Sequence, residues 1–160
     1  MRQRSNFGAT PGMLFADPWE SADWRRIYVE NAMEWSDERH LLGLAEMDET
    51  HREFVALVNA AGAASGAAFV LAFAALCAHT ETHFANEEAW MRDSAFPAEG
   101  EHAGEHRRVL GDLRRFRERV EKGSTMMAKA YIREQVPGWF DLHAATMDAA
   151  LAAHLKARSA

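Results

Sequence analysis

The 160-residue sequence has too little cysteine for an internal disulfide, because Cys77 is the only one. Cys77 lies in the apolar run FAALCA, where a free thiol is typical of a small, buried hydrophobic side chain. The chain also lacks a basic surplus. Its formal net charge of −6 argues against a nucleic-acid-binding protein and against attraction to anionic membranes. With 48% hydrophobic residues, the composition is that of a globular protein with a core.

Signals for secretion and for membrane insertion are missing as well. The N-terminus has no apolar stretch of the kind found in secretion signals, so we expect a cytoplasmic protein. The longest apolar run, residues 60–78, has Ser65 as its only polar side chain. It consists mostly of alanine and glycine, contains turn residues at 62–66 and is followed at once by His79. We therefore do not expect it to insert into a membrane.

Strand-type alternation is absent, and apolar residues recur at helical spacing from Glu46 onward. The pattern predicts helices over about 45–62, 67–93, 101–122 and 125–156. A kink or short break is expected just before Trp139, because Pro137 has no backbone donor. Four helices with short turns predict an all-α, up-down-up-down four-helix bundle over residues 45–160. For residues 1–44 the sequence predicts an N-terminal arm packed on this bundle, with a short helix near residues 24–31. Residues 1–15 are either part of this arm or a partly disordered tail.

Histidines and carboxylates are placed so that each predicted helix carries candidate metal ligands. Pairs four residues apart lie on one face of a helix. The two candidates on the fourth predicted helix, His143 and Asp148, are five residues apart, which separates their side chains by about 140° on a regular helix. A local π-bulge would align them, and such bulges are frequent at functional sites. The candidate ligands are His51, His83, Glu87, His102, His106, His143 and Asp148.

The residue types suit a metal site with two ions. Imidazole binds iron, copper, nickel or zinc, and a carboxylate can bridge two cations. Five histidines and two carboxylates supply two metals and leave one coordination position open. The alternative is that these residues lie on solvated faces of the helices. This is the usual explanation for a single histidine or a single pair. Four helices placing such groups inward by accident would bury unpaired polar atoms at several kcal/mol each.

The other polar residues near this pattern receive different interpretations. His40 and His154 have no partner in the pattern and are interpreted as surface residues. His79 lies one turn before His83, so it is either an outer-shell donor or a pocket residue. Glu88 points about 100° away from Glu87 and is interpreted as solvated or salt-bridged.

Taken together, these motifs resemble those of hemerythrins, and more closely those of the bacterial single-domain type. The resemblance covers about residues 33–155. It is carried by W-S-D at 35–37, D-x-x-H-R at 48–52, H-F-x-x-E-E at 83–88 followed by Met91, H-x-x-x-H at 102–106 and W-x-x-x-H-x-x-x-x-D at 139–148.

The resemblance implies two iron ions with an oxo or hydroxo bridge, and O2 as their ligand. One iron would take His102, His106 and His143, the other His51 and His83, with Glu87 and Asp148 bridging both. Helix geometry places Phe54, Phe84 and Trp139 either in the oxygen pocket or in the ordinary core. Thr146 stands where the family commonly has a bulky aliphatic residue, so the sequence predicts that Thr146→Leu slows autoxidation.

The resemblance also implies a function: reversible dioxygen binding for storage, transport or delivery to an oxygen-consuming protein. We expect a carrier rather than an enzyme. Two alternatives remain open from the sequence. One is an oxygen or redox sensor that acts through a separate partner. The other is turnover of peroxide or nitric oxide, or iron handling, at the same centre.

Overall fold

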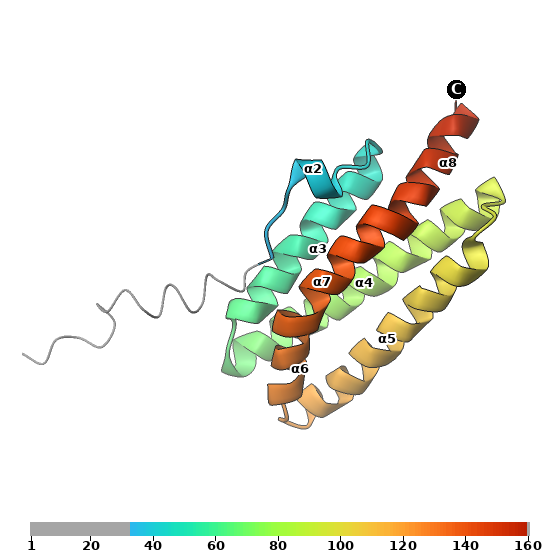
Figure 1. The fold of residues 1–160 in the computed structure, drawn as a ribbon. Coiled ribbons are helices and arrows are strands. Elements are labelled where there is room, and N and C mark those ends of the chain that lie inside the picture. Colours follow the sequence, from blue (N-terminus) through green and yellow to red (C-terminus); the bar gives the residue numbers. More distant parts are fainter. Residues whose placement is uncertain (1–32, 160) are drawn as a thin grey trace, which may run out of the picture. The chain divides into compact units, whose positions relative to one another are not determined.

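Four long helical rods form the body of the protein in the computed structural model, which describes residues 33–159 (Figure 1). The rods run up and down side by side and are joined by short turns, as the sequence predicts. The first three are single helices and the fourth is made of five consecutive segments. The elements are α3 Ala45–Ala63, α4 Gly66–Ser94, α5 Glu99–Glu121, and then α6 Met126–Ala130, η1 Tyr131–Gln135, α7 Val136–His143, η2 Ala144–Asp148 and α8 Ala149–Ser159.

The turns form where the chain carries residues that tolerate a left-handed backbone. Gly66 begins α4 with φ of 54°, and Gly123 follows α5 with φ of 86°. Glycine adopts such angles without steric cost because it has no Cβ. The connections are therefore short enough to make each rod antiparallel to the one before it.

The fourth rod contains two π-helical segments, η1 and η2. The expected break before Trp139 is absent, because the chain remains helical through Pro137. Pro137 lies in the first turn of α7 but inside a continuous helical rod, so its missing N–H leaves a backbone carbonyl of the preceding turn without its usual donor. The wider turn of η1, immediately before it, is where the irregularity occurs instead.

The helix α4 is the most apolar of the four rods. By length and composition alone it could cross a membrane. In the structure Phe69, Phe73 and Leu76 are at most 1% exposed and belong to the main core of the bundle, whereas Leu71 on the opposite face is exposed. It therefore serves as a core helix, and its second half carries candidate ligands.

Residues 33–44 lie against the bundle and include the short helix α2, Asp37–His40. The backbone of Met33 exchanges hydrogen bonds with the side chain of Asn59, at 2.7 and 2.8 Å. At the other end, the backbone amides of Leu42 and Gly43 donate to the buried carboxylate of Asp48. The helix expected near residues 24–31 lies outside the described residues.

Candidate metal centre

The seven candidate ligands converge inside the bundle. Each of the four rods contributes at least one of them, and none of the seven residues is more than 4% exposed. They form two overlapping groups in which one ligand atom from every member lies within 4.8 Å of the others. The larger group is Glu87, His102, His106, His143 and Asp148, and the smaller is His51, His83 and Glu87.

The spacing of four residues works as expected on α4 and α5. Nε2 of His83 lies 2.9 Å from Oε1 of Glu87, one turn further along α4. On α5 the rings of His102 and His106 are 4.5 Å apart. Both pairs point to the bundle interior because each helix buries that face against its neighbours.

The five-residue spacing on the fourth rod is accommodated by the π-helical segment η2, which confirms the predicted bulge. A π turn contains one more residue than an α turn. It therefore brings Asp148 back to the face that carries His143, and Nε2 of His143 lies 3.1 Å from Oδ1 of Asp148. Without the extra residue the carboxylate would point away from the cluster.

On one side of the cluster, three imidazoles present their Nε2 atoms to one another. Nε2 of His143 lies 3.2 Å from that of His102 and 3.3 Å from that of His106. Two nitrogens bound side by side to one ion, at about 2.1 Å each, would be about 3.0 Å apart. The three rings are thus arranged as ligands of a single ion.

The two carboxylates each face both sides of the cluster. Glu87 places Oε1 at 2.9 Å from His83 and Oε2 at 3.2 Å from His106. Asp148 places Oδ2 at 3.2 Å from His51 and Oδ1 at 3.1 Å from His143. Each carboxylate therefore has one oxygen near the three-histidine side and the other oxygen near the side of His51 and His83. This is the arrangement that bridging carboxylates require.

Several polar atoms of the cluster are buried without a hydrogen-bond partner in the described structure. They include Nε2 of His51, Oε2 of Glu87 and both carboxylate oxygens of Asp148. Buried polar atoms are normally paired, and leaving one unpaired costs about 1–3 kcal/mol. Cations at the centre of the cluster would satisfy all of these atoms at once. The donor set therefore fits metal ions.

The two buried carboxylates, Glu87 and Asp148, also require positive charge nearby. Burial and the neighbouring Glu87 act to raise the pKa of Asp148, but the surrounding imidazoles hold it below its ordinary value. Burial acts to lower the pKa of His51, yet its contacts with Asp148 and Glu87 raise it to about 9. The same opposing effects raise the pKa of His102 to about 9. Metal ions bound at this place would supply the positive charge that the two buried carboxylates require.

Aromatic rings surround the cluster. Phe84 stacks face to face on His106, with ring centroids 3.8 Å apart. Trp139 stacks on His143 at 4.9 Å. Its indole N–H donates to Glu105 at 2.8 Å. These two predicted residues therefore lie against the three-histidine side.

The side of His51 and His83 is bounded by three phenyl rings, one of which is Phe84, whose centroid lies 5.4 Å from that of His83. Phe54 lies 6.3 Å from the ring of His83 and stacks on Phe140 at 5.0 Å. Phe140 meets His51 edge-on at 5.2 Å and is 1% exposed. The sequence analysis did not single out Phe140, although it precedes His143 by three residues and so shares its face.

Thr146 does not lie at the cluster. Its side chain is exposed, and its hydroxyl donates to the carbonyl of Leu142 at 2.7 Å. The pocket position expected for it came from the family resemblance, which has a bulky aliphatic residue at this place. The π turn of η2 rotates the following residues, so Thr146 faces outward, whereas Phe140 on the regular helix before His143 faces inward.

The remaining histidines and Glu88 have defined surroundings. Nε2 of His79 lies 3.2 Å from the carbonyl of Thr50, and its ring is 5.9 Å from that of His83, which places it beside the cluster. Glu88 places Oε1 at 3.5 Å from Nδ1 of His106. The surface interpretation of His40 is wrong, because this residue is fully buried.

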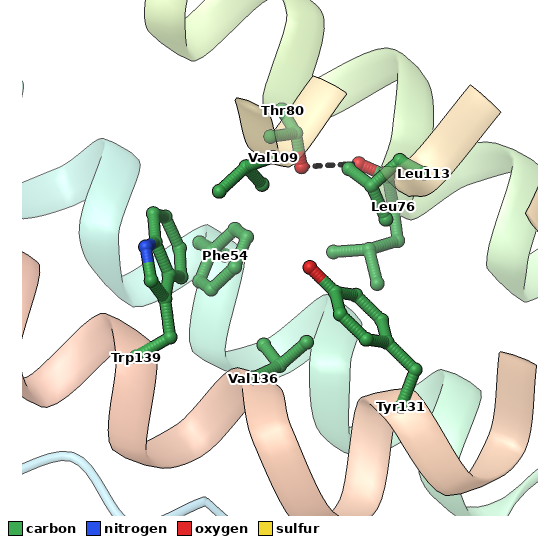
Figure 2. Close-up of a pocket in the computed structure, with 8 residues that line it drawn as sticks. All are labelled: Phe54, Leu76, Thr80, Val109, Leu113, Tyr131, Val136 and Trp139. Carbon is green, nitrogen blue, oxygen red and sulfur yellow. Dashed lines mark hydrogen bonds between the residues drawn. The ribbon is translucent and has the colours of Figure 1, made fainter. Parts of the chain in front are cut away.

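A small cavity adjoins the aromatic residues of the cluster (Figure 2). Its volume is about 10 Å³, which is room for about one water molecule. The hydroxyl of Tyr131 points into it, while that of Thr80 donates to the carbonyl of Leu76 at 2.8 Å (Figure 2). The lining residues are Phe54, Leu76, Thr80, Val109, Leu113, Tyr131, Val136 and Trp139.

Fold and site together define a four-helix-bundle protein with a buried histidine–carboxylate cluster that can hold metal ions. The sequence profile of the hemerythrin HHE cation binding domain matches residues 42–157. The chain therefore belongs to the hemerythrin family. It is 41% identical over 116 residues to a bacteriohemerythrin of Ralstonia nicotianae, which covers 72% of this chain and 83% of the relative.

Solved structures agree with this fold. A crystallised leucine-to-phenylalanine mutant superposes with a TM-score of 0.66 at 21% identity. A leucine-to-tyrosine mutant of hemerythrin superposes with a TM-score of 0.66 at 20% identity. Each match covers 74% of this chain and 93% of the other.

Proposed function

We propose that this protein binds dioxygen reversibly at a pair of iron ions held in the buried cluster. Family membership and the bacteriohemerythrin relative support oxygen binding at a metal centre. The observation that carries the proposal is the asymmetry of the donor set. One side has three converging imidazoles, whereas the other has two, and both share the same two carboxylates.

Each ligand has a place in this proposal. His102, His106 and His143 would hold one iron, His51 and His83 the second, and Glu87 and Asp148 would bind both. When bound, the iron pair supplies two electrons and one open coordination position for dioxygen. Both sides share the two carboxylates, so the side of His51 and His83 has one donor fewer than the three-histidine side. The open position therefore belongs to that side.

The side chains around this position favour binding over further chemistry. The rings of Phe54 and Phe140 are at most 3% exposed and exclude water from the side of His51. An apolar wall withholds the protons that reduction of bound oxygen requires. Five histidines against two carboxylates also disfavour the high oxidation states used by carboxylate-rich oxygenases. We therefore propose a carrier that stores, transports or delivers oxygen to an oxygen-consuming protein.

The experiment is a cycle of oxygenation. The iron-loaded protein is reduced without oxygen, exposed to oxygen and then purged with argon while its absorption spectrum is recorded. We expect a charge-transfer band that appears with oxygen and disappears on purging, with two irons per chain. Irreversible conversion to the diferric form would contradict reversible binding. Rapid consumption of peroxide or nitric oxide would instead favour turnover, and a response seen only with a second protein would favour sensing.

A further inference from the structure

A buried imidazole lies outside the cluster, at the end of α2. His40 is fully buried, and its ring packs against those of Trp35 and Phe140, with centroids 5.1 and 5.4 Å away. A polar side chain without access to solvent needs partners for its polar atoms. Both ring nitrogens of His40 have one, which identifies the residue as a built-in part of the fold.

These two partners fix the tautomer of His40. The backbone N–H of Ser36 donates to Nδ1 at 3.0 Å, so that nitrogen carries no proton. The ring proton is therefore on Nε2, which donates to Oδ1 of Asp141 at 2.8 Å. Arg39 donates to Oδ2 of the same carboxylate at 2.9 Å. Two neighbouring residues of α2 are thus joined to α7 at Asp141.

Asp141 directly follows Phe140, the ring that bounds the side of His51. Phe140 is packed against three other rings: it stacks on Phe54, meets His51 edge-on and contacts His40. Protein interiors are close-packed, so a ring with neighbours on several sides moves little unless one of them is removed. His40 is the neighbour that does not belong to the cluster or to its aromatic wall.

We propose that His40 is a positioning residue for the oxygen-binding side. Its ring contact and its hydrogen bond to Asp141 hold Phe140 against His51, and this slows the entry of water that ends the lifetime of the oxygenated protein. The inference rests on the proposed function. His40 does not touch the metal ligands and acts through Phe140.

The first test uses the decay of the oxygenated protein. His40→Ala and Asp141→Ala should each speed autoxidation roughly five- to tenfold, because each removes a support of Phe140. Asp141→Asn keeps an acceptor for His40 and should stay within about twofold of the wild type. His154→Ala is the matched control, since His154 is hydrogen-bonded to the carbonyl of Ser94 and meets Phe96 edge-on, away from Phe140. It should leave the decay rate unchanged.

A double-mutant cycle shows whether His40 acts through Phe140. If it does, His40→Ala should add no further acceleration in a Phe140→Leu background, because coupled residues are not additive. The proposal would be overturned if the rate increases caused by His40→Ala and Phe140→Leu multiplied in the double variant. It would also be overturned if Asp141→Asn autoxidised as fast as Asp141→Ala.

A second readout needs no oxygen. In zinc-loaded protein with ring-labelled phenylalanine, the signal of Phe140 is assigned by its loss in Phe140→Leu. His40→Ala and Asp141→Ala should increase the flip rate of this ring, whereas Asp141→Asn and His154→Ala should not. An unchanged Phe140 ring would refute the positioning role. If the wild type forms no oxygenated state, the proposed function fails, and the ring measurement still decides the role of His40.

Discussion

The two sides of the cluster share both carboxylates but differ in what surrounds them. On the three-histidine side, His106 is covered by Phe84 at 3.8 Å and contacts Glu88 at 3.5 Å. His143 is covered by Trp139, which is hydrogen-bonded to Glu105. The two stacked aromatic rings thus limit how far these imidazoles can turn.

The two-histidine side is less constrained and more apolar. His51 and His83, with ring centroids 5.1 Å apart, are bounded by the phenyl rings of Phe54 and Phe140. One donor fewer and an apolar wall are the conditions under which a small neutral ligand can be bound and released. This difference supports the proposal that the three-histidine side holds its metal and that the other side exchanges a ligand.

The most damaging change should be one that removes a shared carboxylate. Glu87→Ala takes a ligand from both sides, so we expect metal content to fall from two ions per chain to fewer than one after gel filtration, as measured by elemental analysis. The loss of affinity should exceed the roughly 10–100-fold that removal of an outer partner costs.

The matched control for this change is Glu81→Ala on the same helix. The Glu81 side chain is 45% exposed and lies 4.0 Å from Arg114, so the variant should keep two ions. Two tightly bound ions in Glu87→Ala would show that the carboxylate does not bridge.

A smaller effect should distinguish the two sides. His83→Ala leaves one imidazole and the shared carboxylates on its side, so we expect that side to lose its ion and the chain to retain about one. His143→Ala leaves two imidazoles with the carboxylates, the same donor number as the wild-type side of His51. It should still bind two ions, more weakly. Equal metal loss in the two variants would contradict the assigned asymmetry.

The aromatic walls can be compared by one substitution on each side. Phe54→Leu and Phe84→Leu should each cost roughly 1–2 kcal/mol of unfolding free energy, because both rings are buried. Phe54→Leu should speed autoxidation of the oxygenated protein by roughly threefold or more, and by more than Phe84→Leu does, because the ring of Phe84 lies 5.4 Å from His83 but mainly covers His106. Denaturant unfolding and the decay of the visible band measure the two quantities. Faster decay in Phe84→Leu alone would reverse the assignment of the sides.

The four-helix bundle and the convergence of the seven ligands followed from the sequence because both depend on helical spacing. Residues four apart on regular helices, such as His102 and His106, must share a face. The misaligned spacing of His143 and Asp148 even indicated where the π turn lies. The burial of His40 could not be predicted, since it depends on a contact with Asp141, which is distant in sequence.

The smallest effect is expected at Thr146, where sequence and structure disagree. The family resemblance places it over the oxygen site, and Thr146→Leu would then slow autoxidation. In the structure its side chain is exposed, and its hydroxyl donates to the carbonyl of its own helix at Leu142. We therefore expect Thr146→Leu to leave the decay rate within about twofold and stability within about 0.5 kcal/mol of the wild type. A clearly slower decay in this variant would mean that η2 is not π-helical in the iron-loaded protein, and that Thr146, as well as Phe140, bounds the side of His51.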